Sequence, residues 1–203
     1  MICINFYGGP GIGKSTIAAK MFAALKTAGV KTELVGEFAK DLVYDRAYNV
    51  MADQHYLFAQ QAHRLWRLDK YGVEVAVCDS PLLLALAYNK DPNNGYFTEF
   101  AIDTYKRYTN FDYVLGRNPA FWEKDKRSGD VERGMMDNKI DAILLDVWHD
   151  FPEKLNVDDP VLVEDFITSV VLRVKDTLKE NAIIEELKAR KTEQLSDEPW
   201  KVA

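Results

Sequence analysis

A glycine-rich turn between an apolar run and a helix-forming run constrains the fold of this chain more than any other feature. The turn, Gly8–Ser15, reads GGPGIGKS and fits the spacing G-x-x-x-x-G-K-[ST]. Residues 2–7 before it are apolar and rich in β-formers, and residues 14–28 after it are rich in helix formers. A strand, a glycine turn and a helix in this order predict a loop that surrounds phosphates, called a P-loop.

Each type of residue in this loop has a physical reason to be there. Glycines allow the backbone to turn its N–H groups inward around the phosphates. We expect Lys14 to reach the β- and γ-phosphates of ATP and the Ser15 hydroxyl to bind Mg²⁺. The residues expected to contact ATP are Gly9, Gly11, Ile12, Gly13, Lys14, Ser15 and Thr16.

Two acidic residues follow predicted strands. Glu37 comes after the strand over 32–36, and Asp79 comes after the strand over 74–78. Because ligands bind beyond the carboxyl ends of parallel strands, both acids are expected to face the γ-phosphate. Asp79 is a candidate for holding Mg²⁺ with Ser15, and Glu37 for accepting a proton from a substrate hydroxyl. The alternative for either acid is a helix N-cap. Ser80 is a candidate for contact with substrate.

A predicted helix over residues 50–71 carries glutamines on its polar face. Glutamine amides pair with the edge of a nucleobase, so Gln54 and Gln60, together with Gln61, are candidates for binding substrate. The alternative is a solvated helix face.

A highly charged segment follows the predicted strand over 111–115. Of the eleven residues from Glu123 to Arg133, eight carry charge. Arginines on a lid can close over phosphates and neutralise the charge that develops in phosphoryl transfer. We expect a lid over about 117–136 with Arg117, Arg127 and Arg133, of which Arg127 is the catalytic candidate. The alternative is an exposed charged loop.

The rest of the chain alternates strands with helices. Helices are predicted over 81–88, 97–109 and 137–149, a short strand over 154–157, and one or two helices over 160–190, followed by a frayed tail over 191–203. This order predicts an α/β protein, a P-loop NTPase three-layer sandwich with a five-stranded parallel sheet and helices on both faces. A length of 203 residues suits a single domain, 1–203.

Composition limits the classes of partner. The net charge of −6 argues against a broad nucleic-acid-binding surface but does not exclude a local basic groove. Cys3 and Cys78 lie in predicted strands, as expected for buried, reduced thiols. No apolar run approaches the length that spans a bilayer, so we expect no membrane contact and a cytoplasmic location, in the host cell if the source is a virus.

Several motifs resemble one group of known proteins. GGPGIGKST, VGEFAKDL, DQHYLFAQQ and VAVCDSPLL are similar to segments of the AAA-type P-loop kinases, which include the nicotinamide riboside kinase domain of bifunctional regulators of NAD biosynthesis. The resemblance covers residues 1–157 and includes the pattern Glu37-Phe38-Ala39-Lys40 and the segment WEKDKR, which ends at the lid Arg127. It implies a kinase fold with a lid.

Deoxyribonucleoside kinases and small viral P-loop kinases are also similar. In deoxyribonucleoside kinases a Glu after the second strand is the general base and a helix Gln reads the nucleobase. This chain departs from them at Asp79-Ser80-Pro81, where those kinases have an Arg between the acid and the Ser.

The sequence therefore predicts an ATP- and Mg²⁺-dependent phosphotransferase that acts on a nucleoside, a nucleotide or a related small metabolite. Two alternatives stay open. One is a kinase of a polynucleotide or a modified DNA base, and the other is a nucleotide-dependent regulatory ATPase without an acceptor. A homo-oligomer is compatible with either.

Overall fold

A computed structural model describes the chain over residues 1–90, 95–116, 130–148, 154–157 and 159–196. Side chains are described in these ranges except at 130–134 and 190–196. The strands are β1 (Ile2–Tyr7), β2 (Thr32–Val35), β3 (Val75–Cys78), β4 (Thr109–Gly116) and β5 (Lys154–Asn156). The helices are α1 (Lys14–Thr27), α2 (Phe38–Tyr44), α3 (Tyr48–Met51), α4 (Gln54–Lys70), α5 (Leu84–Tyr88), α6 (Gly95–Tyr105), α7 (Asp130–Trp148) and α8 (Pro160–Ser196).

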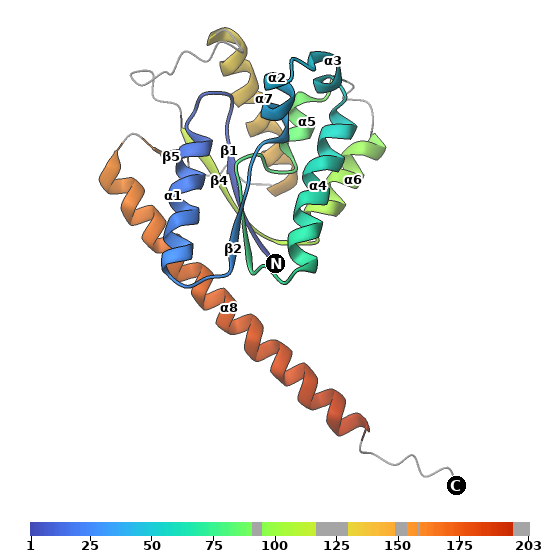
Figure 1. Cartoon of the computed structure of the whole chain (residues 1–203), viewed down its shortest axis with the longest axis vertical. Coiled ribbons are helices and arrows are strands. Elements are labelled where there is room, and N and C mark those ends of the chain that lie inside the picture. The colour runs from blue at the N-terminus through green and yellow to red at the C-terminus, as the bar shows by residue number, and fades with distance from the viewer. Residues whose placement is uncertain (91–94, 117–129, 149–153, 158, 197–203) are drawn as a thin grey trace.

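The strands form one sheet in the order β2-β3-β1-β4-β5, and every pairing is parallel (Figure 1). The prediction of a five-stranded parallel α/β sheet is confirmed. Parallel strands buried on both faces consist of nearly continuous apolar residues. The central strands β1 and β3 follow this rule, with the sequences ICINFY and VAVC and no exposed residue.

Helices cover both faces of the sheet, and the alternation of side chains along β1 separates two cores. Ile2, Ile4 and Phe6 pack with residues of α1 and α8 on one face. Cys3 and Tyr7 pack on the other face with residues of α4, α5, α6 and α7. Both cysteines are buried free thiols, as expected.

Strand register brings three strand ends together at one edge of the sheet. Cys78, the last residue of β3, lies opposite Asn5 of β1 and Val35 of β2. The backbone N–H of Asp79 donates to the carbonyl of Val35 at 3.1 Å. The chain therefore leaves β1, β2 and β3 toward one place, where the glycine loop, Glu37 and Asp79 follow.

The predicted helix over 50–71 is two helices, α3 and α4. The break lies at Asp53, whose side chain accepts a hydrogen bond from the N–H of Tyr56 at 3.0 Å and caps the start of α4. An aspartate that caps a helix stabilises a helix start at that position rather than continuation of the helix before it. Gln54 therefore lies at the first position of α4 instead of inside a longer helix.

Other boundaries also differ from the prediction. The helix expected over 97–109 ends at Tyr105, because the Asn110 side chain donates to the carbonyls of Tyr105 and Tyr108 and β4 begins at Thr109. Helix α7 begins at Asp130, seven residues before the expected start at 137 and inside the predicted lid. Helix α2 begins at Phe38, directly after Glu37, where the N-cap alternative for that residue implies a helix start.

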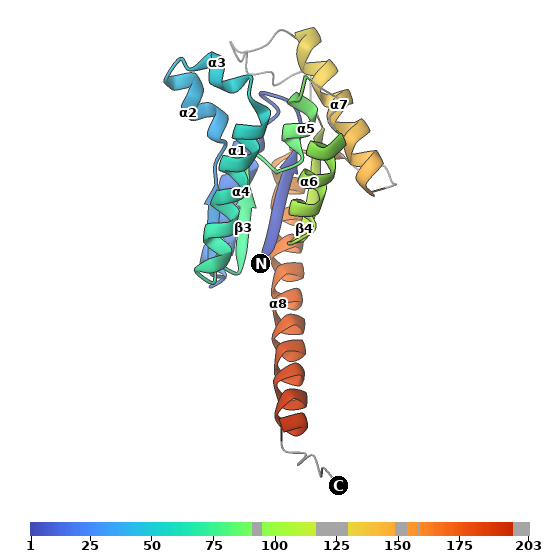
Figure 2. The ribbon, with the colours of Figure 1, turned by 90° about the vertical axis from the view of Figure 1, so that its right-hand side faces the viewer.

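The C-terminal region is one helix, α8, which continues to Ser196 instead of ending near residue 190. Its first half packs against α1 through Val163, Ile167, Val170 and Val174. Its second half extends past the rest of the molecule, and residues 179–189 are all exposed (Figures 1 and 2). Within the described ranges, no helix is long and apolar enough to cross a membrane.

Candidate functional site

The glycine loop ends at an uncapped helix. Gly13, the N-cap residue of α1, has φ of 99°, a left-handed conformation that favours glycine, and offers no side chain to the first turn. The first turn of α1 also lacks an acidic residue. Since the first N–H groups of a helix have no partner within the helix, this turn presents its donors and the positive end of its dipole to an anion.

Lys14 is half-buried, with its amine inside the loop. Its Nζ donates to the carbonyl oxygens of Gly8 and Gly9 at 2.8 and 2.9 Å. Burial lowers the pKa of the Lys14 ammonium from its ordinary value, and the nearby carboxylates of Glu37 and Asp79 oppose this change. The amine is therefore held inside the loop, in the position from which a P-loop lysine contacts phosphate.

Ser15 and Asp79 lie in direct contact. The Ser15 hydroxyl donates to Asp79 Oδ2 at 2.7 Å, and Lys40 Nζ donates to the same oxygen at 2.9 Å. Asp79 is 5% exposed, and its second oxygen, Oδ1, is buried without a hydrogen-bond partner among the described residues. A buried carboxylate oxygen without a partner is costly, which indicates that another group completes this site.

Mg²⁺ fits this arrangement. The ion takes hard oxygen ligands and is usually held by one or two protein groups together with substrate phosphates and water. Ser15 Oγ and Asp79 supply two adjacent oxygens at the end of the loop, and the unpartnered Asp79 Oδ1 is a third oxygen in the same place.

Glu37 lies on the other side of Lys40. It occupies the N-cap position of α2, yet its side chain makes no capping hydrogen bond. Its Oε2 lies 3.7 Å from Lys40 Nζ. The Glu37 side chain therefore does not cap α2, which was the alternative role considered from the sequence. Its carboxylate faces the pocket instead.

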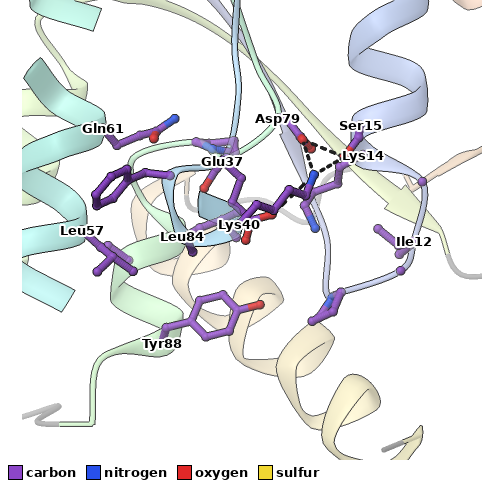
Figure 3. Close-up of a pocket in the computed structure, with 18 of the residues that line it drawn as sticks. Ile12, Lys14, Ser15, Glu37, Lys40, Leu57, Gln61, Asp79, Leu84 and Tyr88 are labelled. Carbon is purple, nitrogen blue, oxygen red and sulfur yellow. Dashed lines mark hydrogen bonds and ion pairs between the residues drawn. The ribbon is translucent and has the colours of Figure 1, made fainter. Parts of the chain in front are cut away.

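One pocket of about 730 Å³ is lined by the residues Gly13, Lys14, Ser15, Glu37, Lys40 and Asp79. Figure 3 shows Glu37 and Lys40 between two walls, with Lys14 and Ser15 of the loop on one side and Leu57 and Gln61 of α4 on the other. Leu84 and Tyr88 of α5 extend the second wall. A volume of several hundred Å³ whose lining combines apolar side chains with polar groups suits a small molecule.

The predicted loop residues lie on the first wall with one exception. Gly11, Ile12, Gly13, Lys14, Ser15 and Thr16 all line the pocket. Gly9 does not, because its N–H donates to Asp137 Oδ1 of α7 at 2.7 Å. Asp137 was not among the predicted site residues, and its distance from Gly9 in the sequence leaves no local signal for the contact.

The position of each glutamine around the axis of α4 decides whether it lines the pocket. Gln54 lines the pocket and donates to the carbonyl of Met51 at 2.9 Å. Gln60 does not line the pocket, whereas its neighbour Gln61 does and is 6% exposed. The Gln61 amide donates to the Gly36 carbonyl at 3.2 Å, beside Arg64, which donates to the same oxygen at 3.0 Å.

The remaining candidates are Ser80 and the lid arginines. Ser80 lines the pocket next to Asp79. Arg117 and Arg127 lie outside the described residues. Arg133 falls within the α7 helix, but its side chain is also outside what the structure describes. The structure therefore does not test the proposed lid.

One comparison with known proteins identifies the family. A family model described as an AAA domain matches residues 3–159, which include the glycine loop, Glu37, Asp79 and all five strands except Ile2 at the start of β1. No curated protein gives a significant match. The match agrees with the parallel sheet and the loop geometry, and with the extent of the kinase-like region expected from the sequence. The chain belongs to the AAA domain family and contains a nucleotide-binding P-loop NTPase domain.

Proposed function

We propose that this protein is a kinase that transfers the γ-phosphoryl group of ATP to a small nucleoside-like or nucleotide-like acceptor. The observation that supports this most is that a single pocket contains two functional walls. The P-loop wall suits a triphosphate. The wall formed by α4 and α5 is largely apolar and includes the buried Gln61, and Glu37 lies between the two walls. A regulatory ATPase needs only the first wall.

The roles of the residues follow from their positions. Lys14 and the N–H groups at the start of α1 would hold the β- and γ-phosphates, and Ser15 and Asp79 would hold Mg²⁺. When bound, Mg²⁺ supplies positive charge that offsets the charge on the phosphates. Glu37 would accept the proton of the acceptor hydroxyl while the oxygen of that hydroxyl bonds to the γ-phosphorus. The bond between the γ-phosphorus and the bridging oxygen breaks, and ADP leaves with that oxygen. Catalysis of this kind depends on positioning and electrostatics.

Gln61 is the best candidate for recognising the acceptor. A glutamine amide offers both a donor and an acceptor, as does the edge of a nucleobase or of a carboxamide. The aromatic rings of Phe38 and Tyr88 and the side chain of Leu57 lie in the same pocket and suit a flat ring. The resemblance to nicotinamide riboside kinases makes nicotinamide riboside one candidate acceptor beside the common nucleosides. Both kinds of molecule combine such a ring with a ribose hydroxyl.

Replacing Gln61 with leucine is expected to raise KM for the acceptor by about ten- to a hundredfold, since a lost hydrogen bond to substrate costs about 1–3 kcal/mol. KM for ATP should stay within about twofold, because the P-loop wall is untouched. Gln60→Leu is the matched control, since this neighbouring glutamine does not line the pocket. A fall in kcat with an unchanged acceptor KM would show instead that Gln61 only supports the turn at Gly36.

The two alternatives predict different phosphorylation products. A polynucleotide kinase would phosphorylate oligonucleotides in preference to nucleosides, with binding that weakens steeply as salt rises. A regulatory ATPase would release inorganic phosphate at a rate that no acceptor changes. Labelled ATP with separate nucleoside, nucleotide, nicotinamide riboside and oligonucleotide acceptors distinguishes all three.

Self-association is a further part of the proposal. The distal part of α8 exposes Ile183, Ile184 and Leu187 between charged residues of both signs, including Glu185 and Lys188. A second copy of this helix running antiparallel would cover the apolar side chains and pair opposite charges. We expect light scattering to show a mass that rises with concentration toward two chains. The mass of one chain at every concentration would exclude this pairing.

A further inference from the structure

Lys40 occupies an unusual position for a residue with no role assigned above. It lies on α2, three residues after Glu37, and its side chain reaches across the pocket toward the loop (Figure 3). Its Nζ lies 2.9 Å from Asp79 Oδ2, 2.5 Å from Ser15 Oγ and 3.7 Å from Glu37 Oε2. The ammonium is therefore surrounded by the oxygens of three separate elements.

Two of these oxygens belong to the residues that suit Mg²⁺. An ammonium group has three donors and no acceptor, and it carries a compact positive charge. Close to Ser15 Oγ and Asp79 Oδ2, the ammonium offsets the negative charge of the Asp79 carboxylate, as a bound metal ion would. A divalent ion cannot bind these two oxygens while the ammonium is this close, because the two cations would repel strongly at such separations.

We propose that Lys40 is a displaceable cation that holds the metal ligands Ser15 and Asp79 in the nucleotide-free protein and leaves them when a divalent ion arrives with the nucleotide. Glu37, already 3.7 Å away, is the acidic partner that keeps the released ammonium in the pocket. Lys40 is then a positioning residue, since it preorganises the metal ligands and moves its charge to the acceptor side. This inference rests on the nucleotide site alone and does not require phosphoryl transfer.

The geometry gives a reason for such an arrangement. Asp79 is buried, and a buried carboxylate without a counter-charge destabilises the folded protein. Lys40 provides this counter-charge in the absence of a metal, and its side chain is 29% exposed, so it has an open route toward solvent and toward Glu37. The Lys40 ammonium therefore competes with a divalent ion for Ser15 and Asp79, and this competition weakens metal binding.

Mn²⁺ binding tests the proposal without any measurement of activity. Free Mn²⁺ is measured by electron paramagnetic resonance in a titration of the full chain saturated with a non-hydrolysable ATP analogue. We expect Lys40→Met to bind Mn²⁺ at least about fivefold more tightly than the wild type, because the competing charge is gone. Lys20→Met is the control, since Lys20 lines the same pocket but pairs with Glu164 at 3.9 Å.

Each outcome decides the question. Equal Mn²⁺ affinity in wild type and Lys40→Met, or equal tightening in Lys20→Met, would overturn the proposal, as would a wild type that binds the analogue but not Mn²⁺. Thermal unfolding in EDTA gives a second readout, in which Lys40→Met is expected to melt below the wild type and to gain more from Mn²⁺ and analogue together.

A measurement on the wild type covers the case in which Lys40→Met does not fold. Lysines are methylated with a ¹³C reagent, and the Lys40 signal is assigned by its absence from Lys40→Arg, which keeps the positive charge beside Asp79. Addition of Mg²⁺ to the analogue-bound protein should shift this signal and leave that of Lys20 in place. A Lys40 signal that Mg²⁺ does not move would contradict the displacement.

Discussion

Replacing Lys14 with methionine is expected to lower kcat/KM for ATP by about a thousandfold, a loss of about 4 kcal/mol of transition-state stabilisation. The Lys14 ammonium lies inside the loop, 2.8 and 2.9 Å from the carbonyls of Gly8 and Gly9. Methionine has a similar length but supplies neither charge nor donors. It would leave two loop carbonyls and the bound phosphates without their cation. Steady-state kinetics and the affinity for a fluorescent ATP analogue measure the effect.

Lys26→Met is a matched control for this prediction. Lys26 lies on the same helix, α1, but is exposed and pairs with Glu33 at 3.2 Å instead of facing the pocket. An exposed pair of this kind contributes little, so the control should keep the nucleotide affinity of the wild type. Nucleotide affinity that is equal in Lys14→Met and the control would remove Lys14 from the phosphate site.

Replacing Glu37 with glutamine is expected to lower kcat by about a hundredfold or more, within the range of a lost general base. Nucleotide affinity should change little, because Glu37 lies between the two walls and not in the loop. Glutamine is nearly isosteric, so the pocket keeps its shape while the group that accepts the proton is lost. Single-turnover measurements with ATP and acceptor separate the chemical step from binding.

Glu33→Gln is the matched control for Glu37. It is the same substitution on the preceding strand, β2, at an exposed residue that pairs with Lys26 outside the pocket. The control should turn over at the wild-type rate. A Glu37→Gln variant that also turns over at this rate would show that Glu37 is not the base.

The fold and the position of the glycine loop are predictable from sequence because local patterns determine them. The loop spacing predicts a strand, a turn and a helix in fixed order. The positions of Glu37 and Asp79 follow from a general property of parallel sheets, whose carboxyl strand ends lie at one edge. The register of β2, β3 and β1 brings these ends together as expected.

The proposed acceptor wall depends on features that short patterns do not determine. Gln60 and Gln61 are adjacent in sequence, and only the rotation of α4 decides that Gln61 lines the pocket. Lys40 is part of the sequence pattern that follows Glu37. Its contact with Ser15 and Asp79 depends on how α2 places its side chain, which a short sequence pattern does not determine.

Contacts between distant segments were also unpredictable. The hydrogen bond from the Gly9 N–H to Asp137 joins the loop to a helix that begins after β4, and no local signal relates the two segments.

The break between α3 and α4 was missed because the capping role of Asp53 competes with a continuous helical pattern. The start of α4 after Asp53 was predictable from the sequence, since aspartate is a preferred N-cap residue.

We propose that one pocket brings a nucleotide and a hydroxyl-bearing acceptor together. The most direct measurement is transfer of ³²P from γ-labelled ATP, with Mg²⁺, to each of a set of nucleosides, nucleotides, nicotinamide riboside and oligonucleotides. We predict that label appears on a small acceptor with the wild type and with Glu33→Gln, and is nearly lost with Glu37→Gln. Label that appears only as inorganic phosphate, at a rate no acceptor changes, would contradict the claim.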